Sequence, residues 1–207
     1  RWGRVMESTG EDPYLNGLFC AGMVRGFQGD DLKEPYKIAS CVKHFAGYGM
    51  AEAGRDYNTV NIGEYELHNT VMPPFKAAAA AGVATFMNSF NEIDGIPSTA
   101  NKMLQRDMLK GEWGWDGFMV SDWGSIGEMM AHGYAKNKKH AAEIALNAGS
   151  DMDMESYAYE EHLENLLKEN KISIAQIDDA VKRVLRVKFR LGLFDDPYKY
   201  CDENRKK

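Results

Sequence analysis

The chain contains 207 residues, of which 44% are hydrophobic, 27% charged and 11% aromatic. This composition is typical of a globular protein with one substantial core, and it excludes a disordered, collagen-like or disulfide-stapled chain. The formal net charge of -6, together with the lack of a long apolar run, argues against a nucleic-acid or membrane partner.

Short apolar runs alternate along the chain with longer segments of helical periodicity. In chain order, the pattern predicts a helix over 13–27, a strand over 37–42, a helix over 64–81, a strand over 83–90, a helix over 101–110, a strand over 118–123, a helix over 140–147, a strand over 150–154, a helix over 157–170 and a last helix over 173–191. Ser173-x-x-Gln176 is typical of a capping box at the start of that last helix. Cys41 lies in an apolar run, so we expect it in the core.

This alternation indicates an α/β fold with a parallel sheet, and two arrangements compete: a doubly wound sheet and a (β/α)8 TIM-type barrel. No Gly-x-Gly-x-x-Gly motif follows the first predicted strand, which disfavours the dinucleotide-binding form of the doubly wound sheet. Polar residues close three successive strands, and a barrel gathers its strand ends into one site. We therefore favour the barrel.

Asp122 and Trp123 close the third predicted strand and give the sharpest local signal of chemistry. In a sugar site, such a carboxylate attacks or stabilises an oxocarbenium-like centre, and the aromatic ring packs on a sugar face. The same two residues also fit an Asp that caps the next helix beside a core Trp. The residues alone leave both readings open.

Lys43 and His44 close the first predicted strand. Both can donate hydrogen bonds to sugar hydroxyls, and Lys43 can lower the pKa of a nearby Asp. Alternatively, Lys43 is the Schiff-base nucleophile of a barrel aldolase, or the pair has only a structural role. His132 and His140 have no Cys or carboxylate companions at metal-ligand spacing, so we expect no metal and no cofactor.

Longer stretches resemble glycoside hydrolase family 3, and within it the periplasmic β-glucosidase branch. They span nearly the whole chain in the family's order: 1–14, 42–49, 54–60, 73–77, 90–97, 111–118, 120–124 and 191–195. The resemblance implies that residues 1–195 form part of the family's N-terminal barrel domain, N-terminally incomplete in this chain. It also implies that residues 196–207 begin a linker toward a C-terminal α/β sandwich domain.

By this resemblance, Asp122 is the catalytic nucleophile of a retaining glycosidase and forms a covalent glycosyl-enzyme. The residues that hold or line the first sugar subsite are Arg4, Lys43, His44, Met87 and Trp123. The implied reaction is hydrolysis of terminal β-D-glucosyl residues from oligosaccharides or glucosides, in the periplasm or outside the cell. From the residues themselves, we expect Lys43 and Arg4 to lower the pKa of Asp122 and keep it ionised.

Three departures from the family pattern qualify these expectations. Phe90 stands where many members carry Tyr, and the loop over 49–57 holds no His, which disfavours the N-acetylglucosaminidase branch. The β-glucosidase branch takes its acid/base Glu from the sandwich domain, so we expect these residues alone to be inactive without the remaining barrel segment and that domain. The alternatives are a β-xylosidase, another exo-β-glycosidase, or a non-catalytic sugar-binding barrel.

Overall fold

A parallel three-stranded sheet forms the centre of the fold, as seen in a computed structural model that describes residues 2–206. The strands lie in the order β1 (Cys41–Phe45), β2 (Thr85–Asn88) and β5 (Phe118–Val120). A short antiparallel pair, β3 (Glu92–Ile93) and β4 (Ile96–Pro97), follows β2. The expectation of an α/β fold with a parallel sheet is therefore confirmed, while these strands by themselves form no closed barrel.

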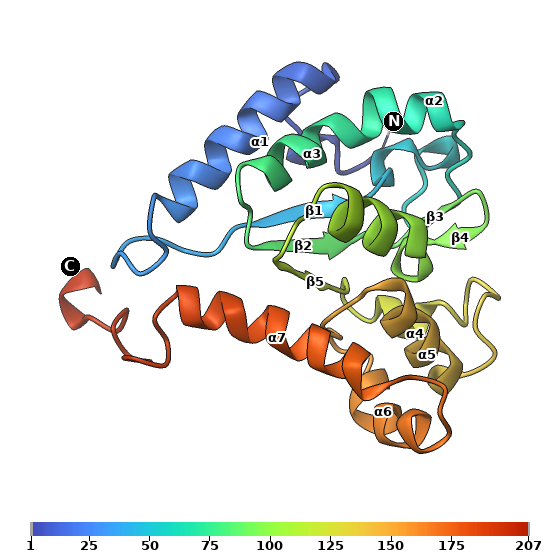
Figure 1. Ribbon diagram of the computed structural model, residues 1–207. Helices are drawn as coiled ribbons and strands as arrows, with labels where there is room; N and C mark the ends of the chain where they lie inside the picture. The colour runs from blue at the N-terminus through green and yellow to red at the C-terminus, as the bar shows by residue number, and fades with distance from the viewer. Residues whose placement is uncertain (1, 207) are drawn as a thin grey trace.

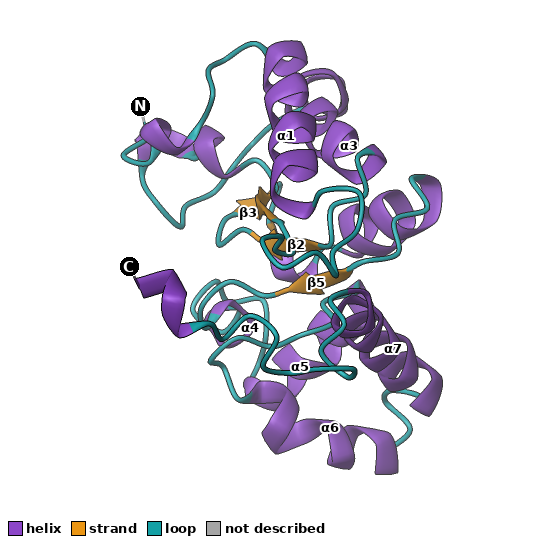
Figure 2. Cartoon of the chain, turned by 90° about the vertical axis from the view of Figure 1, so that its left-hand side faces the viewer, coloured by secondary structure: helices purple, strands orange, loops and turns teal. Residues whose placement is uncertain are grey.

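Helices lie on both sides of this sheet (Figures 1 and 2). Helix α1 (Pro13–Gln28) and helix α3 (Met72–Ala80) pack against each other on the β1 side. The β5 side carries α4 (Ser125–Glu128), α5 (Lys138–Ala148), α6 (Ala158–Lys168) and α7 (Ile174–Arg190). The shorter elements are η1 (Val5–Glu7), η2 (Tyr48–Met50), η3 (Glu52–Gly54), α2 (Glu64–Glu66), η5 (Ser98–Ala100) and η7 (Glu203–Lys206).

Two predicted helices have a wider backbone geometry than the periodicity indicated. The segment over 64–81 divides into α2, a π-helical turn η4 (Leu67–Val71) and α3, with prolines in the first turn of α3, where a missing N–H costs little. The segment over 101–110 is the π-helix η6 (Met103–Glu112). The capping box of α7 is confirmed: Ser173 Oγ accepts from Gln176 N, and Ser173 N donates to the Gln176 side chain at 2.8 Å.

The first and fourth predicted strands differ from their expected form. The first begins at Cys41 rather than at residue 37, and the Cys41 side chain is exposed because β1 is the edge strand of the sheet; its expected core position is wrong. The segment over 150–154 lies beside β5 but forms only a single parallel bridge, between Val120 and Met152. Its ladder is irregular because the N–H groups of Asp151 and Met152 both donate to Met119 O.

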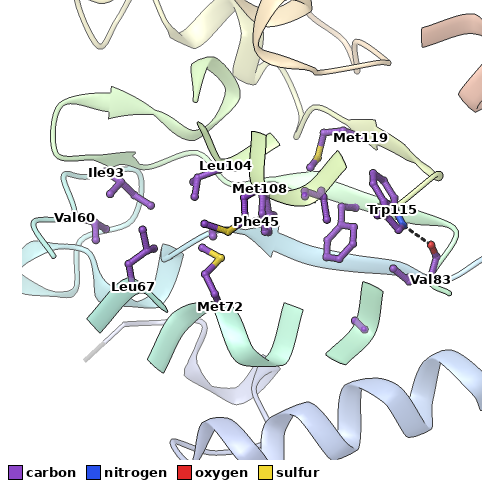
Figure 3. Packing of buried hydrophobic residues seen from close by; sticks show 14 of the residues in the cluster. Phe45, Val60, Leu67, Met72, Val83, Ile93, Leu104, Met108, Trp115 and Met119 are labelled. Atoms are coloured by element: carbon purple, nitrogen blue, oxygen red, sulfur yellow. Dashed lines mark hydrogen bonds between the residues drawn. The ribbon is translucent and has the colours of Figure 1, made fainter. Parts of the chain in front are cut away.

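The main core lies between the sheet and the helices α3 and η6 (Figure 3). Phe45 and Leu104 are fully buried there, and Trp115 is 5% exposed. Trp115 Nε1 donates a 2.7 Å hydrogen bond to Val83 O, the contact drawn as a dashed line in Figure 3. This bond ties the loop before β5 to the start of β2, so it fixes the alignment of two strands that carry site residues.

Replacing Trp115 by Phe removes this hydrogen bond and leaves a buried carbonyl without its donor. We expect the substitution to lower the free energy of unfolding by about 2 kcal/mol, measured by urea denaturation of the full-length protein. Trp113→Phe is the matched control, because Trp113 is half-buried and its indole N–H donates to no described residue. We expect it to cost less than about 1 kcal/mol, and equal losses in the two variants would contradict this assignment.

Candidate active site

The predicted site residues meet at the carboxyl ends of the parallel strands. His44 lies near the end of β1, and Asp122 follows the last residue of β5 by two positions. Strands that run in parallel bring these ends to one edge of the sheet. As a result, His44 Nε2 lies 3.3 Å from Asp122 Oδ2, although the two residues are far apart in the sequence. Both are buried, with 7% and 8% of their surfaces exposed.

Lys43 faces the same site as an unpaired cation. The register between β1 and β2 shifts between Val42 and Phe45, and this irregularity contains both Lys43 and His44. Bulges of this kind redirect side chains next to active sites. Lys43 is exposed, forms no hydrogen bond or ion pair with any residue of 2–206, and lies close enough to Asp122 to lower its pKa. Its ammonium group is therefore available to a ligand.

Arg4 reaches the site from the N-terminal segment and is held by an acidic and two aromatic residues. Its Nε and Nη2 donate to the carboxylate of Glu7 at 2.7 and 2.8 Å. Its guanidinium carbon lies 5.7 Å from the ring centroid of Trp2 and 5.4 Å from that of Tyr48. Such cation–π contacts favour one orientation of a guanidinium group. Arg4 Nη2 thereby comes to 3.4 Å from His44 Nε2.

His44 is neutral in this environment. Burial lowers the pKa of His44 to about 4, and the nearby charges of Arg4 and Lys43 act in the same direction. A neutral imidazole nitrogen either donates or accepts, so Nε2 cannot accept from Arg4 and donate to Asp122 at the same time. When Nε2 accepts from Arg4, Asp122 Oδ2 is a buried oxygen without a hydrogen-bond donor among the described residues, whereas Oδ1 accepts from Trp123 N at 2.7 Å.

Burial raises the pKa of Asp122 above its usual value. The Trp123 N–H, Lys43 and Arg4 all lower it, as expected for the two cations, but together they do not offset the loss of hydration. The expected effect of Lys43 and Arg4 is therefore present, but desolvation outweighs it and the net shift of the pKa is upward. Asp122 is therefore a poorly solvated carboxyl group, and poor solvation makes its ionised form a stronger nucleophile.

Met87 lies on β2, next to β5, and Trp123 lies in the turn that directly follows Asp122. Trp123 is 64% exposed, so it is not a core residue, and its ring is accessible to a ligand. Met87 is half-buried on β2 and pairs in register with Val120 of β5. Asp122 does not cap α4, because the N-cap position is Gly124 and no side-chain bond is made there. The cap interpretation of Asp122 is therefore wrong.

Sequence reasoning missed the aromatic and acidic residues that support Arg4. Trp2 and Tyr48 pack edge to face with ring centroids 5.0 Å apart, and Trp2 Nε1 donates to Asp56 Oδ1 at 3.2 Å. Phe90 packs on Tyr57 with a centroid distance of 4.4 Å. Aromatic residues beside the Arg4 and His44 motifs were the available signal, although periodicity does not indicate which of them meet.

Several other chemistries find little support in this geometry. A Schiff-base Lys is activated by desolvation or by a neighbouring cation, whereas Lys43 is exposed. Among residues 2–206, no group of three or more His, Cys, Asp or Glu side chains is placed to hold a metal ion. Within the same residues, no helix has the length and apolar character needed to cross a bilayer.

Comparison with known proteins decides the family. The family model for the glycosyl hydrolase family 3 N terminal domain matches residues 1–187. The chain belongs to glycosyl hydrolase family 3. The resemblance read from the sequence is thereby confirmed, and the aldolase alternative is excluded.

The relatives of this chain are glycosidases. It is 42% identical, over 97% of its length, to the periplasmic beta-glucosidase of Salmonella typhimurium, of which the match covers 26%. It is 37% identical over its full length to a putative beta-xylosidase of Formosa agariphila, covering 28% of that protein. The crystal structure of a Listeria innocua beta-glucosidase with isofagomine has 49% identity and a TM-score of 0.95, matching 98% of this chain and 29% of that one. The chain therefore spans between a quarter and a third of each of these relatives.

Replacing Lys43 by Met tests its electrostatic role. Because Lys43 lowers the pKa of Asp122, its loss should raise that pKa, so that the acid limb of the kcat/KM profile of the full-length protein moves to higher pH. We also expect kcat/KM at the optimum to fall about 10- to 100-fold, the effect of removing one charged hydrogen-bond donor.

Lys76→Met provides the control for this profile, because Lys76 is an exposed cation that pairs with Glu112 at 3.8 Å. It should leave the acid limb in place. An acid limb that stays fixed or moves to lower pH in the Lys43 variant would contradict the assigned role.

Proposed function

We propose that the protein containing this chain is an exo-acting β-glycosidase that releases terminal, non-reducing β-D-glucosyl residues with retention of configuration. One observation carries the proposal. Asp122 Oδ2 is buried and lacks a hydrogen-bond donor among the described residues, at an edge of the sheet where Arg4, Lys43 and His44 converge. A carboxylate oxygen that is shielded from water and free of hydrogen bonds is suited to attack an electrophilic carbon.

In the proposed mechanism, Asp122 Oδ2 attacks the anomeric carbon as the glycosidic bond breaks. The leaving oxygen takes a proton from an acid/base residue, and a glycosyl ester of Asp122 forms. Water, deprotonated by the same acid/base residue, then attacks the anomeric carbon, and the Asp122 carboxylate leaves. Retention requires the two carboxyl groups to lie about 5 to 5.5 Å apart. We assign the acid/base role to a Glu outside this chain, in a C-terminal α/β sandwich domain.

The neighbouring residues bind the sugar in this proposal. Lys43 donates from its unpaired ammonium group, Arg4 from its remaining N–H groups, and neutral His44 from one ring nitrogen. Trp123 offers an exposed ring on which a sugar face can pack, and Met87 contributes an apolar contact. Nitrogen groups that donate to sugar hydroxyls, together with an aromatic surface, suit an uncharged sugar ring.

We further propose that residues 1–195 belong to a (β/α)8 barrel completed by other segments of the same protein, and that residues 196–207 begin a linker. The open edge of β1 and the parallel order of β1, β2 and β5 support this arrangement, because an unpaired parallel strand is normally covered. The name of the Salmonella relative supports a periplasmic location.

For the sugar specificity, a β-xylosidase activity is the main alternative to the proposed β-glucosidase activity. Several relatives are named as β-xylosidases, and xylose lacks the hydroxymethyl group of glucose. The higher identity to β-glucosidases favours glucose. Assay of the full-length protein on 4-nitrophenyl β-glucoside and β-xyloside should give the higher kcat/KM with the glucoside.

Replacing Asp122 by Asn in the full-length protein should lower kcat by about a thousandfold or more, because the amide cannot form the glycosyl ester. Asp122→Gly with added azide should restore turnover and yield the α-glucosyl azide, since azide then attacks from the face vacated by the carboxylate. The matched control is Asp116→Asn, an exposed acid on the loop before β5, which should keep wild-type activity.

Wild-type turnover that survives in Asp122→Asn would remove Asp122 from the nucleophile role. Reversible sugar binding by the wild-type protein without any turnover would instead support a non-catalytic sugar-binding barrel.

A further inference from the structure

A second segment holds the loop that carries Asp122. Residues 150–154 run beside residues 119–124 and are joined to them by several hydrogen bonds. Asp151 N donates to Met119 O at 2.8 Å, and Ser121 N donates to Met152 O at 2.9 Å. Further along, Gly124 N donates to Met154 O, and Met154 N donates to Ser121 Oγ, each at 2.8 Å. Asp122 therefore lies inside a stretch of backbone bonded to one neighbour before and after it.

The Asp151 side chain anchors this neighbour to β5 and to helix η6. Its Oδ2 accepts from the backbone N–H of Met119 at 2.8 Å, and Met119 is part of the core in Figure 3. Lys110 Nζ lies 2.6 and 2.7 Å from the two carboxylate oxygens of Asp151 and donates to Gly149 O at 2.7 Å. The side chains of Lys110 and Asp151 are only 5% and 1% exposed.

A buried ion pair of this kind adds little net stability to a fold, because the free energy of desolvating the two charges opposes their attraction. Burial lowers the pKa of Lys110 to about 8 and raises that of Asp151, so each charge loses hydration that the other only partly replaces. Apolar residues of similar volume often give equal or greater stability at such positions. What the pair adds is a single geometry, because Asp151 Oδ2 accepts from the backbone N–H of Met119 and the Lys110 ammonium group donates to the backbone carbonyl of Gly149.

We propose that Asp151 is a positioning residue for Asp122. Together with Lys110, it fixes residues 150–154 against residues 119–124. It thereby holds the Asp122 carboxylate at the carboxyl-terminal end of the parallel strands. This inference rests on the proposed function, in which Asp122 attacks the sugar. Asp151 acts through Met119, which precedes Asp122 by three residues, and it makes no contact with Arg4, Lys43 or His44.

The test isolates the attack step in the full-length protein. The probe is 2,4-dinitrophenyl 2-deoxy-2-fluoro-β-D-glucoside, whose leaving group departs without protonation, so the rate constant of covalent labelling reports nucleophilic attack. We expect Asp151→Asn to lower this rate constant about tenfold, with little change in the probe concentration that gives half-maximal rate. The sugar-binding residues should be undisturbed.

Asp179→Asn is the matched control. Asp179 pairs with Arg106 of the same helix η6 at 3.4 Å and with Arg183 at 3.1 Å, but it makes no bond to β5. We expect this variant to lose stability and to keep the wild-type labelling rate. An unchanged rate in Asp151→Asn, or the same fall in both variants, would overturn the positioning role.

If Asp151→Asn does not fold, the same labelling experiment is done with Ser121→Ala. It removes the Ser121 Oγ bond to Met154 N from the same pair of segments without leaving a buried charge, and we expect a fall of about threefold in the labelling rate. An unchanged rate in that variant overturns the inference. A wild-type protein that the probe does not label would instead refute the proposed function itself.

Discussion

The burial of a single carboxylate, that of Asp122, is the constraint on which the rest of the site depends. Moving a carboxylate out of water costs free energy and raises its pKa, so the fold must supply compensating charges and hydrogen bonds. One oxygen receives the Trp123 N–H, and the other receives no hydrogen bond from the described residues. This difference between two chemically equivalent oxygens is the reason that the proposed function assigns the attack to Oδ2.

The surrounding charges follow from that constraint. Two cations, Arg4 and Lys43, lower the pKa of Asp122, and the same two cations contribute to keeping His44 neutral. Arg4 is in turn held by Glu7 and by the rings of Trp2 and Tyr48. The site thus contains one buried carboxyl group, one cation without a protein partner among the described residues, and a neutral imidazole, which are the groups that the proposed function uses.

The approximate positions of three parallel strands were predictable because they depend on local patterns, although their ends differ from the predicted ones by two or three residues. Apolar runs beside Lys43-His44 and before Asp122-Trp123 indicate two strands, and parallel pairing then brings their carboxyl-terminal parts together, although β1 runs on to Phe45. The packing of Arg4 between Trp2 and Tyr48 depends on tertiary contacts, which local patterns do not indicate. Arg4 was assigned to the site only through the family resemblance.

Burial was the property that the sequence indicated least well. Cys41 was predicted to be a core residue, but it lies on an edge strand, where fewer neighbouring residues cover its side chain. Lys110 ends the predicted helix over 101–110 and Asp151 lies in the predicted strand over 150–154, and neither pattern indicates the buried pair that they form next to β5. The net shift in the pKa of Asp122 depends on the balance between desolvation and nearby cations, and a residue pattern gives the cations without the desolvation.

The most direct test of this account is to identify the residue that becomes covalently glycosylated. The full-length protein is trapped with a 2-deoxy-2-fluoro-β-D-glucosyl donor, digested with pepsin and sequenced by mass spectrometry. The account predicts a single adduct on the peptide that contains Ser121-Asp122-Trp123, with the added mass on Asp122. An adduct on another carboxylate, such as the exposed Asp56 of the neighbouring loop, or turnover without any trapped adduct, would contradict it.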